Sequence, residues 1–499
     1  MREYFAGFAT FFAMAYIAFL NPSILNGMGM PSGAVFLATC VVAALASAVS
    51  GWKLGIPAAL ACGMGLNVFT ASFAELNHIP WPDLLVVTGI VSIAIFLASL
   101  GPWRRNLIAS VPDQIFYAIK AGVGAILTTV AVTQIDSFAS HGGGIGHPPG
   151  RVWAFSLFFI GLAVIVGLKL AYMYSQDSTV GPRWLKTLEL LDSAAFTISI
   201  VTVMAIVWIW VWHGHAPIMS SPEKAIFWSW NGTGVLAQIH LSTLESCIGF
   251  GIAVLFIITL DIAGSPIEYV RQPEIAQSMT DERIASIKDQ SLKIDSFFNI
   301  VASLAGVTPI TYYAENHAGW KAGGRSGRAM VVVTIGFALL AVFGFVSLLE
   351  GWPIVEAIPR IAAMPTVFFV GLLVVAESFV MPAPPATAGA SGSRSGSSSD
   401  LTPALTFIPA ATTVVLASVT LSLDVAIAAG ILSYVVIQTF PKKVVPNKAE
   451  WSRELGFVLA GAGLVLLLNF GNAVQRRAAA PACSPAPSTP AASVAPPPQ

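Results

Sequence analysis

The sequence predicts an all-α polytopic membrane protein, and two observations carry that prediction. Of the 499 residues, 56% are hydrophobic and only 10% are charged, a balance that a soluble fold of this length does not show. Apolar runs of roughly 20 residues follow one another along the chain, which is the length that a helix needs to cross about 30 Å of hydrocarbon. The formal net charge is zero, which argues against nucleic acid as a partner.

We expect about fourteen membrane segments and one further apolar stretch near the C-terminus. The first, Phe5 to Leu25, lacks the basic start and the small-residue cleavage site of a signal peptide, and its apolar stretch is too long for one, so we interpret it as a span. The later segments are expected at residues 33–52, 55–76, 84–100, 113–133, 152–171, 194–212, 246–269, 292–305, 306–320, 330–349, 355–378, 404–420, 423–440 and 454–470.

The basic residues predict the orientation, because Lys and Arg accumulate in cytoplasmic loops. With the N-terminus in the cytoplasm, the loop lysines and arginines fall on that side except for Arg151, Lys224 and Arg360. We therefore expect a multi-pass inner-membrane protein with a cytoplasmic N-terminus. Arg476 and Arg477 would lie outside after a fifteenth span, so whether residues 454–470 cross the membrane stays open.

The chain divides into a long membrane domain and two segments of biased composition. The Pro-, Ala-, Gly- and Ser-rich segments are too poor in apolar residues to pack into a core. We expect a transporter domain at residues 1–440 with inverted repeats at roughly 5–213 and 243–440, a flexible cytoplasmic linker at 382–400, an extra hydrophobic segment at 441–475 and a disordered tail at 478–499.

Two segments break the spanning-helix pattern in the same manner. Residues 54–67 read LGIPAALACGMGLN, and residues 304–316 read LAGVTPITYYAEN, with Pro309 ahead of a β-prone run. Non-helical backbone at membrane depth is tolerated only where it is buried in protein or lines a cavity, and paired interruptions mark the substrate site of many transporters. They occupy the third and tenth positions, which predicts a seven-plus-seven inverted repeat, and we expect Gly65 to line the site. The alternative without a functional role is that Gly and Pro are simply common in membrane helices.

Two acidic residues inside predicted spans are candidate functional groups, because charge is unfavourable there. Asp261 lies within the eighth segment, and Glu315 begins the half-helix after the second interruption. Their carboxylates can accept hydrogen bonds from the N–H groups of a base, and a buried carboxyl can also carry a proton. A helix–helix hydrogen bond without a transport role is the alternative for each.

Three other charged residues have a structural interpretation. Lys120 lies about two turns from the cytoplasmic end of the fifth segment, and we favour snorkelling or a carboxylate partner over substrate contact. Asp295 and Arg360 lie near span ends, where interfacial solvation is the default expectation.

The sequence offers no motif for a metal or a catalytic centre. The four cysteines are scattered without a CxxC pair, the histidines are not clustered, and we interpret Cys40 and Cys62 as small apolar packing residues. An HExxH motif, a P-loop and a Ser/His/Asp grouping are also absent from the sequence. We therefore expect a protein that is not an enzyme, with no metal or cofactor and with the proton gradient as its energy source.

Four sequence segments resemble the AzgA-like hypoxanthine/guanine/adenine permeases of the nucleobase-ascorbate (nucleobase:cation symporter) superfamily. They are TFFAMAYIAFLNPSIL, ATCVVAAL, LACGMGLN and ENHAGWKAGGRSG, and the resemblance runs from about residue 5 to about residue 440. It implies fourteen spans in two inverted repeats, a core and a gate domain, a homodimer in many members, and import of purines with protons.

The resemblance also implies site residues. Asn67 matches the Asn that follows GMGL in the family and is implicated in binding or in the transport cycle. Asp261 and Glu315 match the acidic residues of the eighth and tenth segments, which are implied purine contacts and the candidates for proton coupling. Tyr313 and Ala314 stand where the superfamily has a Tyr-Gly pair whose backbone contacts the base.

The expected function is proton-coupled import of a purine base of the adenine, hypoxanthine or guanine class. Departures from the family pattern, such as Cys62 where a Pro usually precedes GMGLN, leave xanthine, uracil or another heterocycle open. An anion transporter of the same fold is a further alternative, against which the acidic pair argues. A membrane enzyme or a non-transporting sensor is the least favoured.

Overall fold

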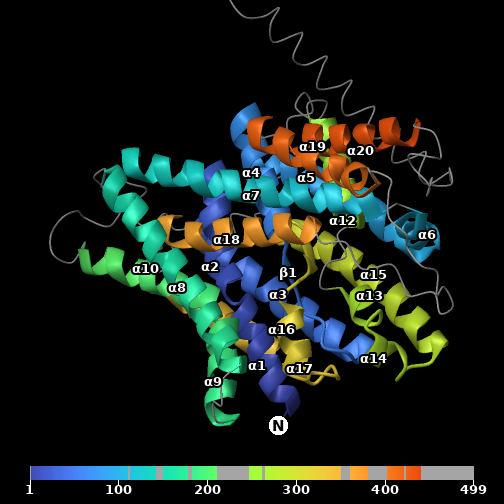
Figure 1. Ribbon diagram of the computed structural model, residues 1–499, viewed down its shortest axis with the longest axis horizontal. Helices are drawn as coiled ribbons and strands as arrows, with labels where there is room; N and C mark the ends of the chain where they lie inside the picture. The colour runs from blue at the N-terminus through green and yellow to red at the C-terminus, as the bar shows by residue number, and fades with distance from the viewer. Residues whose placement is uncertain are drawn as a thin grey trace, which may run out of the picture.

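The computed structural model describes residues 2–110, 113–141, 150–177, 182–210, 247–260, 265–349, 360–379, 402–420 and 423–439. The described part of the chain is built from helices and two short strands (Figure 1). The elements up to residue 210 are α1 (Arg2–Met14), α2 (Tyr16–Leu25), η1 (Asn26–Met28), α3 (Ser32–Leu54), β1 (Leu60–Cys62), α4 (Met64–Asn77), α5 (Trp81–Leu100), α6 (Trp103–Ser110), α7 (Asp113–His141), α8 (Arg151–Asp177), α9 (Pro182–Ser193) and α10 (Ala195–Trp210).

The second half repeats the same kinds of element, with long helices on either side of a short strand. Its elements are α12 (Ile248–Leu260), α13 (Pro266–Tyr269), α14 (Pro273–Ala276), α15 (Asp281–Leu304), β2 (Ile310–Tyr312), α16 (Asn316–Lys321), α17 (Ala329–Leu349), α18 (Arg360–Ser378), α19 (Thr402–Thr420) and α20 (Leu423–Thr439).

The protein is a multi-pass membrane protein. Among the described residues, six helical stretches are long and apolar enough to cross a membrane, and α9 with α10 forms a seventh that is bent by 69°. Four shorter apolar helices lie in the second half. Large apolar side chains such as Leu97, Leu170 and Leu339 are exposed on the outer surface, as expected for contact with lipid. The count of about fourteen segments stays a prediction.

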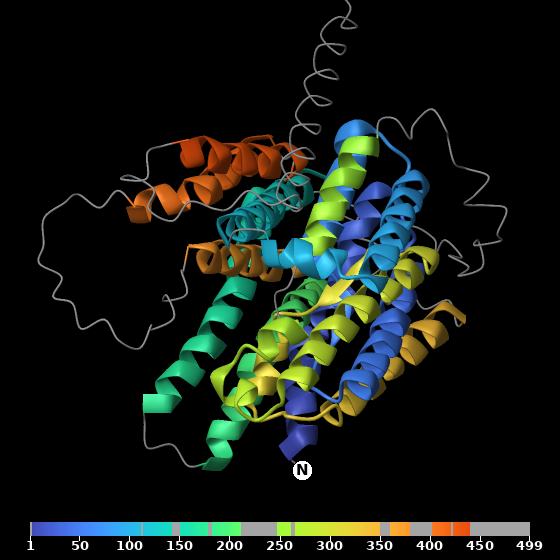
Figure 2. The same ribbon diagram turned by 90° about the vertical axis from the view of Figure 1, so that its right-hand side faces the viewer.

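The helices form two groups (Figure 2). The strand group, α1 to α5 with α15 to α17, surrounds β1 and β2, and α3 packs on both α15 and α17. The α7 group consists of α7, α8 and α18 to α20, with α18 and α19 both packed on α7. Small residues let α7 and α18 approach closely, because a Cβ on Gly371 would lie 2.8 Å from the carbonyl oxygen of Gly124.

Both interrupted segments are non-helical, as predicted. Helix α3 ends at Leu54 and α4 begins at Met64, while α15 ends at Leu304 and α16 begins at Asn316. Between these ends, β1 and β2 pair antiparallel with Leu60 opposite Tyr312 and Cys62 opposite Ile310. The described part of the chain is therefore helical apart from this one pair of short strands, which forms because two interrupted segments can satisfy each other's backbone N–H and C=O groups by pairing.

Several segment boundaries in the structure differ from those predicted from the sequence. The ninth segment was expected to begin at residue 292, but α15 begins at Asp281, where the Thr280 side chain accepts a hydrogen bond from the Arg283 amide at 3.3 Å. The span expected at residues 306–320 contains β2 and the short helix α16. The first span consists of two helices, α1 and α2. The segments expected at residues 382–400, 441–475 and 478–499 lie outside the described residues.

Asp295 does not lie in interfacial solvent as expected. Its side chain is 8% exposed and its carboxylate accepts from Arg104 Nη2 at 2.6 Å, so α15 and α6 are joined by a buried ion pair. Arg104 also donates to the Ile258 carbonyl at 2.8 Å, the Leu292 carbonyl at 3.0 Å and Ser296 Oγ at 2.7 Å. A buried arginine needs this many acceptors because each unsatisfied donor is unfavourable away from water.

Candidate functional site

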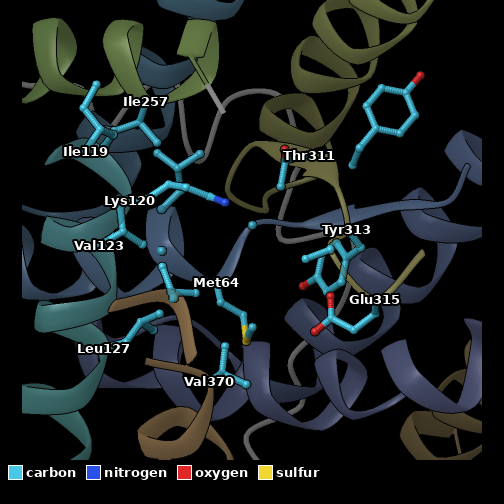
Figure 3. A pocket seen from close by; sticks show the side chains of 16 residues that line it. Met64, Ile119, Lys120, Val123, Leu127, Ile257, Thr311, Tyr313, Glu315 and Val370 are labelled. Atoms are coloured by element: carbon cyan, nitrogen blue, oxygen red, sulfur yellow. The ribbon is translucent and has the colours of Figure 1, made fainter. Parts of the chain in front are cut away.

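A cavity of about 140 Å³ lies where the two interrupted segments meet the α7 group (Figure 3). An apolar protein cavity of about 150 Å³ can hold benzene, so this space suits a small ring compound. The lining residues are Gly63, Met64, Gly65 and Leu66 from the first interruption, Thr311 to Glu315 from the second, Ile119, Lys120, Val123 and Leu127 from α7, Ile257 from α12, and Val370 and Val374 from α18.

The first turn of α4 forms one wall of the cavity. The Gly63 amide donates to the Pro309 carbonyl at 3.1 Å, which fixes the start of α4 against the second interruption. The first amides of a helix have no partner within the helix, so this turn can present backbone donors to a ligand. Gly65 lies against α7, and a Cβ added there would overlap the Val123 side chain. Gly65 thus lines the cavity, and its part in binding a substrate stays a prediction.

Glu315 lies on the wall formed by the second interruption. Its carboxylate accepts a hydrogen bond from the Tyr16 hydroxyl at 2.6 Å, which ties it to α2. The next residue anchors this wall, because Asn316 Oδ1 accepts from the Ala59 amide at 2.9 Å and its Nδ2 donates to the Ala59 carbonyl at 3.0 Å. Glu315 is half-buried and faces the cavity, as Figure 3 shows.

Tyr313 and Ala314 also line the cavity. The Tyr313 hydroxyl donates to the Cys62 carbonyl at 2.6 Å, and its amide donates to the Ala59 carbonyl at 3.3 Å. Both donors of Tyr313 thus hold β1 and β2 together. Cys62 itself is buried and is not in a disulfide, and the same is true of Cys40, which confirms the packing role expected of both.

Asn67 lies outside the set of residues that line the cavity. Its side chain is fully buried, its Nδ2 donates to Asn21 Oδ1 at 2.5 Å, and its Oδ1 accepts from the Thr308 hydroxyl. Asn21 in turn donates to Thr39 Oγ1 at 2.7 Å. Asn67 therefore joins the two interrupted segments behind the wall, a placement that fits orientation of the site better than direct contact with a ligand.

Asp261 lies outside the described residues, so its role stays a prediction. Ile257, four residues earlier in the chain and on α12, does line the cavity.

Lys120 lines the cavity, and Figure 3 shows its amine directed into that space. The expectation of snorkelling to the interface or a carboxylate partner stays a prediction. The neighbours of Lys120 on α7, Ile119, Val123 and Leu127, are apolar. The facing walls therefore bring a cationic donor and an anionic acceptor to one small cavity, an arrangement that can orient a polar ring between them.

Curated permeases are similar to this chain over most of its length. The adenine permease AdeP of Escherichia coli K12 is 27% identical over 384 residues, which cover 74% of this chain and 76% of the permease. The guanine/hypoxanthine permease PbuO of Bacillus subtilis 168 is 26% identical over 384 residues, covering 74% of this chain and 80% of that protein. The chain is a distant homologue of the AzgA-like purine permeases. No protein-family model matches it.

Solved transporter structures share the fold. The transmembrane domain of a cyanobacterial bicarbonate transporter, BicA, has a TM-score of 0.51 at 12% identity, covering 86% of this chain and 96% of that domain. The structure of SLC26A9 also has a TM-score of 0.51, at 11% identity, covering 87% of this chain and 64% of the other. At these identities the likeness concerns the fold alone. The similar curated proteins are permeases and not enzymes.

Several residues that shape the site were not predicted. Tyr16, Asn21 and Asn316 each hold part of the wall through side-chain hydrogen bonds. One signal could have found the two asparagines, because an amide inside an apolar segment must have a partner there. Asn21 stands in AFLNPSIL, and Asn316 directly follows Glu315.

Proposed function

We propose that the protein imports purine nucleobases of the adenine, hypoxanthine and guanine class across the inner membrane, coupled to protons. The observation that carries this proposal is the Glu315 carboxylate on the wall of a ring-sized cavity between two interrupted segments. Purine rings carry N–H donors, for which an ionised carboxylate is a strong acceptor. The distant homology to adenine and guanine/hypoxanthine permeases supports the same substrate class.

In the proposed mechanism the base stands between the first turn of α4 and Glu315. Glu315 accepts a hydrogen bond from a ring N–H, and the backbone amides at Gly65 supply donors to the ring nitrogens. Asn67 keeps the two interrupted segments in register. Glu315, together with Asp261, takes up the proton that accompanies the base, since a carboxyl next to a cavity in a transporter can act as a proton relay.

Alternating access follows from the two helix groups. We propose that the strand group is the core domain and the α7 group the gate domain, and that the base is exposed to either side as one moves against the other. The chain would then have about fourteen spans in two inverted repeats of seven, a cytoplasmic N-terminus and a homodimeric assembly. Val123, Leu127 and Val370, which line the cavity from the α7 group, are apolar and make no hydrogen bonds through their side chains that such a movement would have to break.

Uptake of radiolabelled adenine, hypoxanthine and guanine in a purine-permease-deficient strain tests the proposal. We expect saturable uptake that a protonophore abolishes and that Glu315→Gln reduces by about tenfold or more, because a hydrogen bond to a charged group is replaced by a neutral one. Glu282→Gln, an exposed acid at the start of α15, is the matched control and should transport normally. Absence of uptake of any nucleobase, or uptake that neither the protonophore nor Glu315→Gln changes, would refute it.

A second candidate is an anion transporter, and one observation favours it. The amine of Lys120 faces the cavity and could attract an anion. Glu315 on the facing wall opposes this, because it would repel a small anion. A substrate-dependent anion current that is insensitive to protonophore would decide for the anion transporter.

A further inference from the structure

A second hollow lies within the strand group, where α15 packs against both α3 and α5. It has a volume of about 400 Å³, which is within the range of about 300–1,000 Å³ that is usual for small-molecule sites. We call it the α15 groove, and its lining residues are Val49 and Lys53 from α3, Phe96 from α5, and Gln290, Lys293, Ile294, Phe297 and Phe298 from α15. It shares none of these residues with the described lining of the cavity that holds Glu315, so the proposed transport mechanism does not use it.

The α15 groove has a polar end and an apolar end. The start of α15 meets the end of α3, because Arg283 donates to the Leu54 carbonyl at 2.5 Å, and the two helices pack side by side and so run antiparallel. The rings of Phe96 and Phe297 lie with their centroids 6.1 Å apart, which places α5 at the apolar end. The polar lining residues therefore lie toward the end of α3, and the apolar ones lie deeper along the helices.

The apolar end of the groove opens on the surface that faces lipid. Phe297 in its lining is 48% exposed. Leu45 on α3 and Leu100 on α5, each one helical turn from a lining residue, are also exposed. Only hydrocarbon surrounds such side chains in a membrane-spanning helix, so an acyl chain is the ligand that suits this end.

The polar end of the groove lies at the depth of the lipid head groups. Lys53 stands in the last turn of α3 next to Trp52, which is 76% exposed, and its amine lies 4.4 Å from the centroid of the Trp52 ring. Exposed tryptophans are enriched at the membrane–water interface, and a lysine near a helix end keeps its amine there. In the predicted orientation this interface is the cytoplasmic one.

The charges of the groove favour an anion. Of the described residues that line it, Lys53 and Lys293 alone carry charge, and both are basic. Lys293 also donates to Asp289 at 2.7 Å, one turn earlier on α15, but an ammonium has three donors and can hold a second acceptor. Two amines beside an apolar surface are complementary to a phosphate group that carries acyl chains.

We propose that the α15 groove binds an anionic phospholipid, with its phosphate between Lys53 and Lys293 and an acyl chain along Phe96 and Phe297. Basic pockets between membrane helices on the cytoplasmic side recognise such head groups. A soluble phosphate ester would leave the apolar end unfilled, and a zwitterionic lipid would bring its own cationic group to the two lysines. A lipid in this groove contacts α3, α5 and α15 together, so its binding stabilises the folded protein.

Titration of the purified full-length protein in detergent with phosphatidylglycerol, or with phosphatidylcholine of the same acyl chains, tests the proposal. The unfolding temperature is measured at each lipid concentration, and the concentration that gives half of the full stabilisation reports the apparent affinity. One lysine near the membrane surface contributes about fivefold to the attraction of an anionic lipid. We therefore expect saturable stabilisation by phosphatidylglycerol at a concentration about tenfold or more below that needed of phosphatidylcholine.

Neutral variants of the two lysines locate the site. Lys53→Gln and Lys293→Gln should each weaken the apparent affinity for phosphatidylglycerol by about fivefold and leave that for phosphatidylcholine within about twofold of wild type. Lys53→Arg should keep the preference, because it keeps the charge. Lys288→Gln is the matched control, since it removes the same charge from α15 outside the described lining, and it should bind both lipids as wild type does. Lys53→Gln alone decides the matter if Lys293→Gln does not accumulate, because Lys53 is exposed.

Glycerol phosphate, which has the phosphate but no acyl chain, distinguishes a lipid from a soluble ligand. We expect it to leave the unfolding temperature unchanged at the concentrations where phosphatidylglycerol saturates. Stabilisation by glycerol phosphate as large as that by phosphatidylglycerol would overturn the proposed lipid site in favour of a soluble phosphate ester. Equal affinity for the two lipids, or an equal loss of affinity in Lys53→Gln and Lys288→Gln, would also overturn it.

Discussion

Two pairs of basic and acidic side chains in the described part of the chain, Arg104 with Asp295 and Lys120 with Glu315, differ in what surrounds them. Arg104 and Asp295 are in direct contact at 2.6 Å, and Arg104 has three further acceptors. Lys120 and Glu315 instead lie on facing walls of a cavity of about 140 Å³. The first pair is closed and joins α6, α12 and α15, whereas the second frames a space that a ligand can enter. The second pair is therefore the candidate functional site because it faces a cavity, and not because its charges are buried.

Asp295→Ala breaks the closed pair and should give the largest effect. It leaves the Arg104 charge buried without its carboxylate, a change that typically destabilises a protein by about 3–5 kcal/mol. We expect a large fall in the thermal unfolding temperature of the purified protein. Asp289→Ala is the control on the same helix, because its pair with Lys293 is about one-third exposed and surface pairs contribute little. Equal falls in unfolding temperature for the two variants would contradict the expected difference between the buried pair and the surface pair.

Asn316→Ala tests whether a neutral side chain next to the cavity stabilises the protein through its hydrogen bonds, as the Arg104–Asp295 pair does. It removes both hydrogen bonds to Ala59 and leaves the buried Ala59 amide unsatisfied, at about 1–3 kcal/mol, while the Ala59 carbonyl keeps the hydrogen bond from the Tyr313 amide. We expect reduced thermal stability and reduced uptake together. Asn77→Ala, which removes a part-buried bond within α4, should lower stability much less. A normal unfolding temperature for Asn316→Ala would show that the wall does not depend on this amide.

Gly65→Ala tests the cavity between Lys120 and Glu315, because it brings a methyl group into the Val123 side chain. Overpacking of this kind is destabilising by about 1–3 kcal/mol, and here it also narrows the cavity. We expect a loss of base uptake that Gly65→Ala/Val123→Ala largely restores. Measured uptake in the double variant that is as poor as in the single one would mean that the contact between α4 and α7 is not the cause.

Tyr16→Phe should have the smallest of these effects. It removes one hydrogen bond to Glu315 and leaves the ring packed against Phe196. We expect a weakening of apparent base affinity by roughly tenfold or less, with little change in stability. Tyr4→Phe, at an exposed position on α1, is the control and should transport as wild type does. Wild-type affinity in Tyr16→Phe would show that the hydroxyl does not position the carboxylate.

The sequence predicted the membrane architecture better than it predicted which side chains pair with each other. Proline and glycine at residues 54–67 and 304–316 exclude a continuous helix, so both interruptions and the place of Glu315 followed from local chemistry. The pairing of Arg104 with Asp295 joins residues 191 positions apart, and such contacts depend on how helices pack. The sequence left the placement of Lys120 open for a similar reason, because α7 is apolar over most of its surface and its sequence does not fix which face meets the cavity.

Binding of tritiated hypoxanthine to purified protein tests the central claim most directly, namely that the cavity between Lys120 and Glu315 is a purine site. We predict saturable binding that Glu315→Gln weakens by about tenfold or more while its unfolding temperature in the absence of base stays that of wild type. Absence of saturable binding to wild-type protein, or equal affinity in Glu315→Gln, would contradict the claim.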